Sequence, residues 1–184
     1  KVELEAAHYA DIKAAEKMAQ LYDEIRKAND VDTDKEIHEL NVFFVRLLFC
    51  FFAEDTGVFE QGQFTRALAS LTLEDGSDLR GVLERLFEVL GTPVADRAPL
   101  PAYLSDFDYV GGSLFAERTG TPAFSGRARS IILQSGELDW SEINPDIFGS
   151  MMQAVVRAST RSEVGMHYTS LDNILRVLRP LLFE

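Results

Sequence analysis

The sequence predicts an all-α protein, mainly a helical bundle, and three observations support this. Apolar residues recur at helical spacing over most of the chain, and several segments open with helix-capping residues. Strands that alternate with helices, as in a nucleotide-binding sheet, are absent from the pattern. Prolines and glycines gather between about 91 and 124, where we expect irregular loops. A chain of 184 residues with 46% hydrophobic residues can bury a core without disulfides or metals.

The first two helices are the most clearly marked. Residues 3–28 carry an apolar stripe typical of an amphipathic helix. The stripe consists of Ala14, Met18, Leu21 and Ile25. After a break, Thr33 and Glu36 have the spacing of a capping box, in which each side chain accepts from an otherwise unpaired backbone N–H. The helix that begins there is apolar on nearly all sides over 42–53, so we expect it to be buried centrally and to end near Gly57.

Further helices are predicted along the rest of the chain. A short one is expected at 63–71, and Asp78 can cap another that runs through Leu90. Ser125 can cap a helix that contains Ile131, Ile132 and Leu133. Asn144-Pro145 is a strong start signal, because proline at the first helical position loses no hydrogen bond. Residues 171–178 also have a helical pattern.

Charge and composition exclude several classes of protein. The chain has 18 Lys and Arg against 30 Asp and Glu, a net charge of −12, which argues against a free-standing duplex-DNA binder. Cys50 is the only cysteine, so neither an internal disulfide nor a cysteine-based zinc site can form. No secretion signal opens the sequence, and its longest apolar run is too short to cross a bilayer. We therefore expect a cytoplasmic protein that does not contact membranes.

Two short acidic motifs resemble known chemistry but have simpler interpretations. Asp11-Ile12-Lys13 has nuclease-like spacing, yet it lies within a predicted helix, so an exposed helical surface is the favoured interpretation. Asp106 and Asp108 could hold a divalent metal, but a lone pair of this kind is more typical of a solvated loop. The three histidines are too scattered to indicate a metal site. The sequence thus predicts no metal site.

Several single residues call for a structural explanation. Arg46 lies within an apolar helix and therefore needs a partner, for which Glu54 or Asp55 is the candidate. Glu54 and Asp55 are otherwise interpreted as a polar exit from that helix. Cys50 is expected to be a small apolar core residue. Trp140 is expected to anchor the turn before the next helix through ring burial and its indole N–H.

Five segments resemble one family, the MmeI-like restriction–modification enzymes. They are NVFFVRLLFCFFAEDTG at 41–57, YVGGSLF at 109–115, ELDW at 137–140, INPDIFGS at 143–150 and GMHYTS at 165–170. The resemblance covers roughly 10–184, in order and without large gaps. Members of this family are single long polypeptides. An N-terminal nuclease is followed by a helical spacer, an adenine-specific DNA methyltransferase and a target-recognition region.

The resemblance implies two parts, a helical spacer domain at 1–156 and the start of the methyltransferase domain at 157–184. It assigns Gly165, His167, Tyr168 and Thr169 to the segment beside bound S-adenosylmethionine. Glycine allows close backbone approach, and an aromatic ring and a hydroxyl can line the methionine end of the cofactor. The alternative is an ordinary helix cap at this point, with the tyrosine packed into a core.

The sequence also departs from the family. The glycine-rich cofactor loop, the catalytic Asn/Asp-Pro-Pro-aromatic motif and the nuclease signature do not occur in it. Asn144-Pro145-Asp146 has aspartate where the second proline should stand, and 157–163 replaces the usual basic stretch before the cofactor-side glycine. We therefore expect no catalytic residue here, no bound cofactor, and a fragment that neither methylates nor cuts DNA.

The resulting expectation is a rigid spacer that holds nuclease and methyltransferase domains at a fixed separation. Its partners would be those flanking domains and, through the parent enzyme, double-stranded DNA. The alternative is a helical module for protein–protein interaction or dimerisation without an enzymatic role. A third hypothesis, a complete metal enzyme, would use Asp106 and Asp108.

Overall fold

The computed structural model describes residues 2–144, and side chains from residue 9 onward. Over this range it contains six α-helices, two short 3-10 helices and no strand, so the all-α prediction is confirmed. The α-helices are α1 (Val2–Ala28), α2 (Asp34–Asp55), α3 (Gln63–Leu71), α4 (Leu79–Leu90), α5 (Ala102–Ser105) and α6 (Gly126–Ser135); the 3-10 helices are η1 (Val94–Asp96) and η2 (Trp140–Glu142). The helices predicted after Asn144, and the proposed boundary at 156/157, lie outside the described residues.

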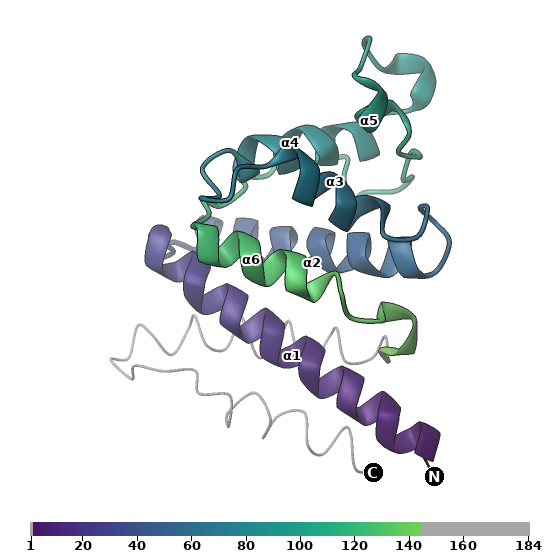
Figure 1. Ribbon diagram of the computed structural model, residues 1–184. Helices are drawn as coiled ribbons and strands as arrows, with labels where there is room; N and C mark the ends of the chain where they lie inside the picture. The colour runs from purple at the N-terminus through teal and green to yellow at the C-terminus, as the bar shows by residue number, and fades with distance from the viewer. Residues whose placement is uncertain (1, 145–184) are drawn as a thin grey trace.

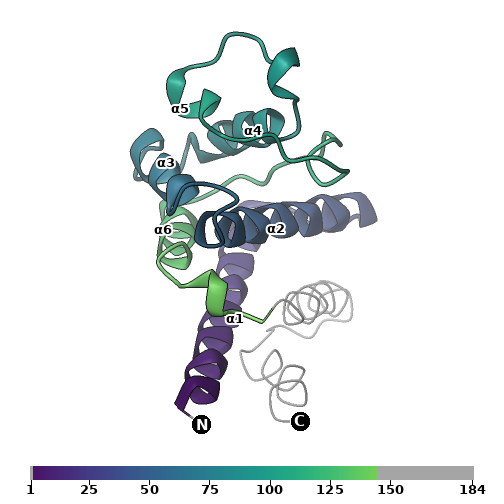
Figure 2. The same cartoon turned by 90° about the vertical axis from the view of Figure 1, so that its right-hand side faces the viewer.

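Helix α2 lies in the middle of the arrangement. Figures 1 and 2 show α1 on one side of α2, α3, α4 and α5 on the other, and α6 beside α2, between α1 and α3. Helix α6 packs along α1, and α3 contacts α2, α4 and α6. The expected irregular region is present, since residues 91–124 form only η1, α5 and loops. Helix α5 lies across α2 from α1, whereas the end of the irregular region returns to α1, where Ala123 is hydrogen-bonded to Asn29.

Local capping chemistry sets several helix ends. The predicted capping box is present: Glu36 N–H donates to Thr33 Oγ1 at 3.3 Å, and Thr33 N–H donates to the Glu36 carboxylate at 2.9 Å. Ser125 Oγ accepts from Ala128 N–H at 3.1 Å and caps α6, as predicted. Asp78 precedes α4 but accepts from Leu73 N–H at 2.8 Å, so it closes the preceding turn rather than capping the helix.

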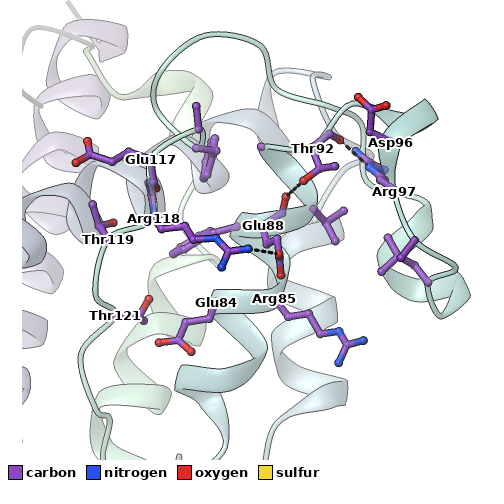
Figure 3. A pocket seen from close by; sticks show the side chains of 18 of the residues that line it. Glu84, Arg85, Glu88, Thr92, Asp96, Arg97, Glu117, Arg118, Thr119 and Thr121 are labelled. Carbon is purple, nitrogen blue, oxygen red and sulfur yellow. Dashed lines mark hydrogen bonds and ion pairs between the residues drawn. The ribbon is translucent and has the colours of Figure 1, made fainter.

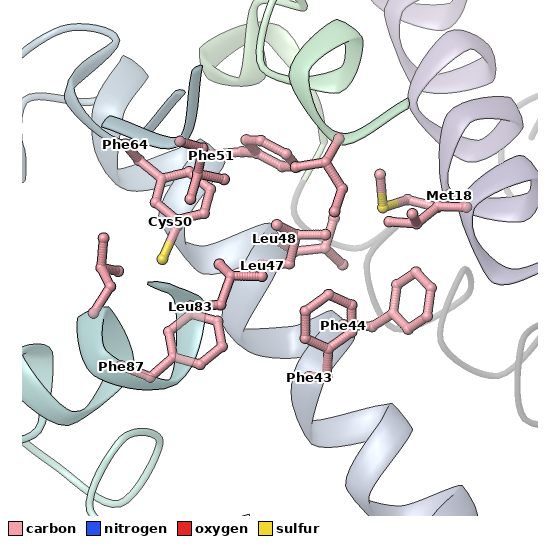
Figure 4. Packing of buried hydrophobic residues seen from close by; sticks show 14 of the residues in the cluster. Met18, Phe43, Phe44, Leu47, Leu48, Cys50, Phe51, Phe64, Leu83 and Phe87 are labelled. Atoms are coloured by element: carbon pink, nitrogen blue, oxygen red, sulfur yellow. The ribbon is translucent and has the colours of Figure 1, made fainter. Parts of the chain in front are cut away.

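The core is built around α2 (Figure 4). Phe43, Phe44, Leu47 and Phe51 are at most 1% exposed. The α1 stripe packs against the same core, because each of its four members is at most 2% exposed. The expectation of a central buried helix is thus confirmed, except that Val45 remains 40% exposed. None of the helices in the described range is both long and apolar enough to span a membrane.

Helix α3 is held at both ends by charged side chains from other helices. Gly62 precedes α3 and supplies no side-chain cap, and Glu54 of α2 replaces it by accepting from the backbone N–H and hydroxyl of Thr65. At the other end, Arg129 of α6 donates to the carbonyls of Ala69 and Thr72 at 3.1 and 3.2 Å. A carboxylate at the N-terminus and a guanidinium at the C-terminus both complement the helix dipole.

Glu54 is therefore not the polar exit that the sequence suggested. Its side chain is buried, with the residue only 1% exposed. Burial raises the pKa of this carboxyl above its usual value, while the hydrogen bonds from Thr65 partly counteract the shift. The prediction was wrong because the Glu54 carboxylate accepts from Thr65, eleven residues later in α3, and not from a group of α2. The helical periodicity of α2 gives no information about a partner in another helix.

Candidate functional site

A charged cleft lies between α4, η1 and the segment 114–121 (Figure 3). Its volume is about 770 Å³. Arginines and carboxylates line it in equal number: Arg46, Arg85, Arg97, Arg118, Glu84, Glu88, Asp96 and Glu117. These residues come from α2, α4, η1 and the loops that follow η1 and α5. No local sequence pattern therefore predicts the cleft.

Arg46 lies beneath the cleft and is itself buried, at 4% exposure. Its guanidinium donates to the carbonyls of Leu114 and Glu117, at 2.8 and 2.5 Å. The same group lies 5.6 Å from the ring centroids of both Phe87 and Phe115, within cation–π distance. Burial lowers the pKa of Arg46, with the charge of Glu117 opposing the shift. Arg46 thus ties the segment 114–117 to α2.

The expected need for a structural partner of Arg46 is confirmed, but the predicted partners are wrong. Glu54 and Asp55 accept from Thr65 and Trp140 instead, so neither pairs with this arginine. The carbonyl of Leu114 is 68 residues away along the chain. Such an acceptor leaves no trace in the sequence, because every residue has a carbonyl.

Two other arginines shape the wall of the cleft. Arg97 donates to the carbonyls of Thr92 and Phe107 at 2.9 and 2.8 Å, and fastens η1 to α4 and α5. Its Nη2 atom is buried without a hydrogen-bond acceptor among the described residues. Arg118 pairs with Glu88 at 3.0 Å across the mouth, but both side chains are largely exposed. An exposed pair of this kind adds little stability.

The cleft is lined by both positively and negatively charged side chains. In the part of the chain that the structure describes, no three His, Cys, Asp or Glu side chains are grouped to hold a metal ion. Asp106 and Asp108 are exposed, as expected of a solvated loop. They lie in the loop after α5, where the backbone carbonyl of Asp106 accepts from the Gln63 amide at 3.2 Å.

Asp11 contradicts the surface-helix interpretation of its motif. The residue is only 3% exposed, and its carboxylate accepts from the backbone N–H of Asn144 at 3.0 Å. Its partner lies 133 residues further along the chain. Asp11 therefore belongs neither to a nuclease site nor to a solvated helix face. Its carboxylate makes a tertiary hydrogen bond.

Cys50 and Trp140 have the predicted structural roles. Cys50 is fully buried, and burial raises the pKa of its thiol. The Trp140 ring is also fully buried and stacks on Phe51 with the centroids 5.1 Å apart. Its indole N–H donates to the carbonyl of Ser135 at 2.8 Å, which anchors the turn as expected.

The predicted cofactor-side residues Gly165, His167, Tyr168 and Thr169 lie outside the described residues. Their proposed role beside S-adenosylmethionine stays a prediction.

Together these features define a structural class. The described chain is an all-helical domain in which charged side chains fasten distant segments. Asp11, Arg46 and Glu54 do so as buried groups, and Arg129 does so as a partly buried one. Comparison with known proteins identifies the family to which such a domain belongs. Residues 38–115 match the family described as MmeI, helicase spacer domain.

A relative and a solved structure extend that match. The chain is 48% identical over 186 residues to DNA methyltransferase A of Bacillus subtilis (strain 168), across all of this chain and 21% of that protein. It is 43% identical to the Type IIL restriction–modification enzyme MmeI, whose structure was solved in complex with DNA, with a TM-score of 0.69 over 92% of this chain and 22% of that one. The chain is a helical spacer region of an MmeI-like restriction–modification enzyme, and it spans about a fifth of the length of these relatives.

Proposed function

We propose that this spacer positions the nuclease and methyltransferase domains of its parent polypeptide. The proposal is supported by the contacts that buried and partly buried charged side chains make between distant segments. Arg46 holds the loop at 114–117 against α2, and Glu54 and Arg129 hold α3 between α2 and α6. Each charge is placed to keep one segment fixed relative to another. A domain held together in this way can transmit a defined geometry to its neighbours.

The parent is proposed to methylate adenine in double-stranded DNA with S-adenosylmethionine, in the cytoplasm. Methyl transfer to the adenine amino group requires the base to leave the duplex stack, which needs a firmly placed methyltransferase. Residues 157–184 would begin that domain, and Gly165, His167, Tyr168 and Thr169 would line the cofactor. The chain itself is proposed to be inactive, because it carries neither the catalytic motif nor the cofactor loop.

Calorimetry with S-adenosylmethionine tests whether the parent polypeptide binds the cofactor while the 184-residue chain alone does not. The 184-residue chain is expected to show no detectable binding, whereas the parent polypeptide binds the cofactor. In the parent, Tyr168→Ala should weaken binding about tenfold, the equivalent of 1.4 kcal/mol. Tyr103→Ala, at an exposed tyrosine, is the matched control and should leave binding unchanged. Micromolar binding by the 184-residue chain alone would contradict the proposal.

An interaction or dimerisation module is the second candidate function, favoured by one observation. Three exposed apolar residues, Val94, Tyr103 and Tyr109, occur within the irregular region and are 44–65% exposed. Exposed aromatic side chains are enriched at protein interfaces. The mass in solution, measured over a hundredfold range of concentration, decides this point. A dimer that dissociates on dilution and is lost in Tyr103→Ser supports the module, and a monomer throughout excludes dimerisation.

A further inference from the structure

The charged cleft has at its base a buried guanidinium that forms no ion pair with a described acid. Arg46 is 4% exposed and lines the cleft. Its Nε and Nη2 atoms donate to the carbonyls of Leu114 and Glu117, and its Nη1 atom donates to none of the residues that the structure describes. The ion pairs of the described chain do not include it. Neutral groups therefore hold this charge: two carbonyls and the rings of Phe87 and Phe115.

This arrangement leaves the buried charge without a direct counter-charge. Removing a guanidinium from water is costly unless hydrogen bonds and an opposite charge replace the lost hydration. The two carbonyls supply hydrogen bonds, and the exposed Glu117 side chain acts on Arg46 only through its charge. A carboxylate inside the cleft would accept from Nη1 and provide the missing counter-charge. Hydrogen bonds between a guanidinium and a carboxylate are among the strongest that proteins form.

A second arginine of the cleft is held in the same way. Arg97 donates to backbone carbonyls through Nε and Nη1, and its Nη2 atom has no acceptor among the described residues. Arg118, in contrast, is paired with Glu88, and this pair lies between Arg97 and Glu117 in Figure 3. Two hydrogen bonds already fix the orientation of each of the first two guanidiniums. They can therefore receive an anion with little loss of side-chain freedom.

The lining of the cleft restricts the kind of anion that fits. Arginines and acids occur in equal number, so the cleft lacks the surplus of positive charge that a polyanion such as nucleic acid requires. Pro99, Leu100 and Phe115 add apolar surface beside the charges. The volume of about 770 Å³ lies within the range of small-molecule sites. These features favour a single carboxylate attached to an apolar group.

We propose that the charged cleft is a carboxylate-binding site, in which the carboxylate accepts a hydrogen bond from Arg46 Nη1 and the apolar lining contacts the group that carries it. A free organic acid and an acidic side chain of the parent polypeptide present the same chemistry to this site. The proposal goes beyond the positioning function and does not depend on it.

Calorimetry with benzoate tests the site in the 184-residue chain. Benzoate joins one carboxylate to an apolar ring, and it should bind saturably with about millimolar affinity, as expected of so small a ligand. Benzamide has the same shape without the charge and should bind at least about tenfold more weakly. Phenyl phosphate, a dianion, should also bind more weakly, because four acids line the cleft. Absence of benzoate binding, or tighter binding of benzamide or phenyl phosphate, would overturn the proposal.

Two variants locate the site. Glu117→Gln removes a negative charge that acts on Arg46 and keeps the backbone carbonyl, so benzoate should bind about threefold more tightly. Glu137→Gln, at an exposed acid outside the cleft, is the matched control and should leave the affinity unchanged. Arg46→Gln, provided that the chain stays folded, should weaken binding at least about tenfold. Equal affinities of Glu117→Gln and the wild type would place benzoate elsewhere and refute the assignment.

The same titration in the full-length parent identifies the source of the carboxylate. Undiminished benzoate binding by the parent shows that the cleft stays open, and assigns the site to a free acid. Loss of binding in the parent, when the 184-residue chain still binds, shows that the cleft is filled from within the polypeptide, and assigns it to an acidic side chain. Failure of benzoate to bind either protein rejects the site and leaves the proposed positioning function intact.

Discussion

The Asn29 side chain forms hydrogen bonds with both the N–H and the carbonyl of Ala123. The side-chain amide donates to the Ala123 carbonyl at 2.9 Å, and its oxygen accepts from the Ala123 N–H at 2.8 Å. The same amide also donates to the carbonyl of Ile25 at 2.8 Å, at the end of α1. One side chain thus closes a helix and holds an extended segment 94 residues away.

Replacement of Asn29 should therefore destabilise the domain. Asn29→Ala leaves both Ala123 groups and one helix carbonyl without this partner, and we expect a loss of about 2 kcal/mol in the free energy of unfolding. Asn29→Asp keeps the acceptor but places a carboxylate oxygen against the carbonyls of Ile25 and Ala123, which it repels, so its loss should be at least as large. Urea denaturation measures both. Gln20→Ala, at an exposed amide on the same helix, should stay within about 0.5 kcal/mol of the wild type.

Arg46 should not tolerate replacement by lysine. A lysine ammonium cannot reproduce the planar fork that donates to Leu114 and Glu117 while it lies against two aromatic rings. We expect Arg46→Lys to lower the free energy of unfolding by about 2 kcal/mol, since hydrogen bonds to charged groups contribute 1.5–3 kcal/mol each. Arg80→Lys, at an exposed arginine of α4, is the control. Equal thermal midpoints for the two variants would contradict the role assigned to Arg46.

Glu54 should make stability depend on pH. The folded state raises the pKa of this carboxyl above 4.5, so it binds the proton more tightly than the unfolded chain does. The stability that protonation confers is fully present below about 4.5 and is lost as the pH rises through the folded-state pKa. Relative to Glu54→Gln, the wild type should lose stability as the pH rises from about 4.5 through the raised pKa of this carboxyl. Glu74→Gln, at an exposed acid, controls for net charge; a constant difference between wild type and Glu54→Gln would refute the prediction.

Trp140 is the only tryptophan, which makes its fluorescence a probe of η2 (Trp140–Glu142) and the residues beside it. The buried ring should emit at short wavelength and resist quenching by acrylamide in the folded chain. Asp55→Ala removes the acceptor of the Trp140 backbone N–H and should increase quenching before global unfolding. Asp106→Ala should leave quenching unchanged. Strong quenching in the folded wild type would contradict the packing of Trp140 on Phe51.

The helices could be predicted from sequence where their signals are local. Thr33 and Glu36 are three residues apart, as are Ser125 and Ala128, so each cap is visible within a single turn. The polar tertiary contacts could not be predicted in the same way. Arg46 and Asp11 find backbone partners 68 and 133 residues away, and a backbone N–H or carbonyl has no sequence signature. The cleft was missed for the same reason, because its lining is scattered from residue 46 to residue 121.

The prediction of a spacer came from the resemblance to one family and not from the periodicity of apolar residues. Helical spacing and charge predicted an acidic helical domain, and only the order of the five family-like segments indicated a spacer. The assignment of Gly165, His167, Tyr168 and Thr169 rests entirely on that resemblance, since a glycine followed by aromatic and hydroxyl residues also fits an ordinary helix cap. These four residues remain a prediction that cofactor binding by the parent can test.

Helix α3 has nine residues, fewer than an isolated helix needs to form in water. Its two charged supports belong to other helices, Glu54 to α2 and Arg129 to α6, and they lie 75 positions apart in the sequence. Chimeras that recombine spacers from related enzymes should therefore inherit both supports from one parent. A crossover between residues 54 and 129 is safe only where the second parent supplies the same acid and the same arginine.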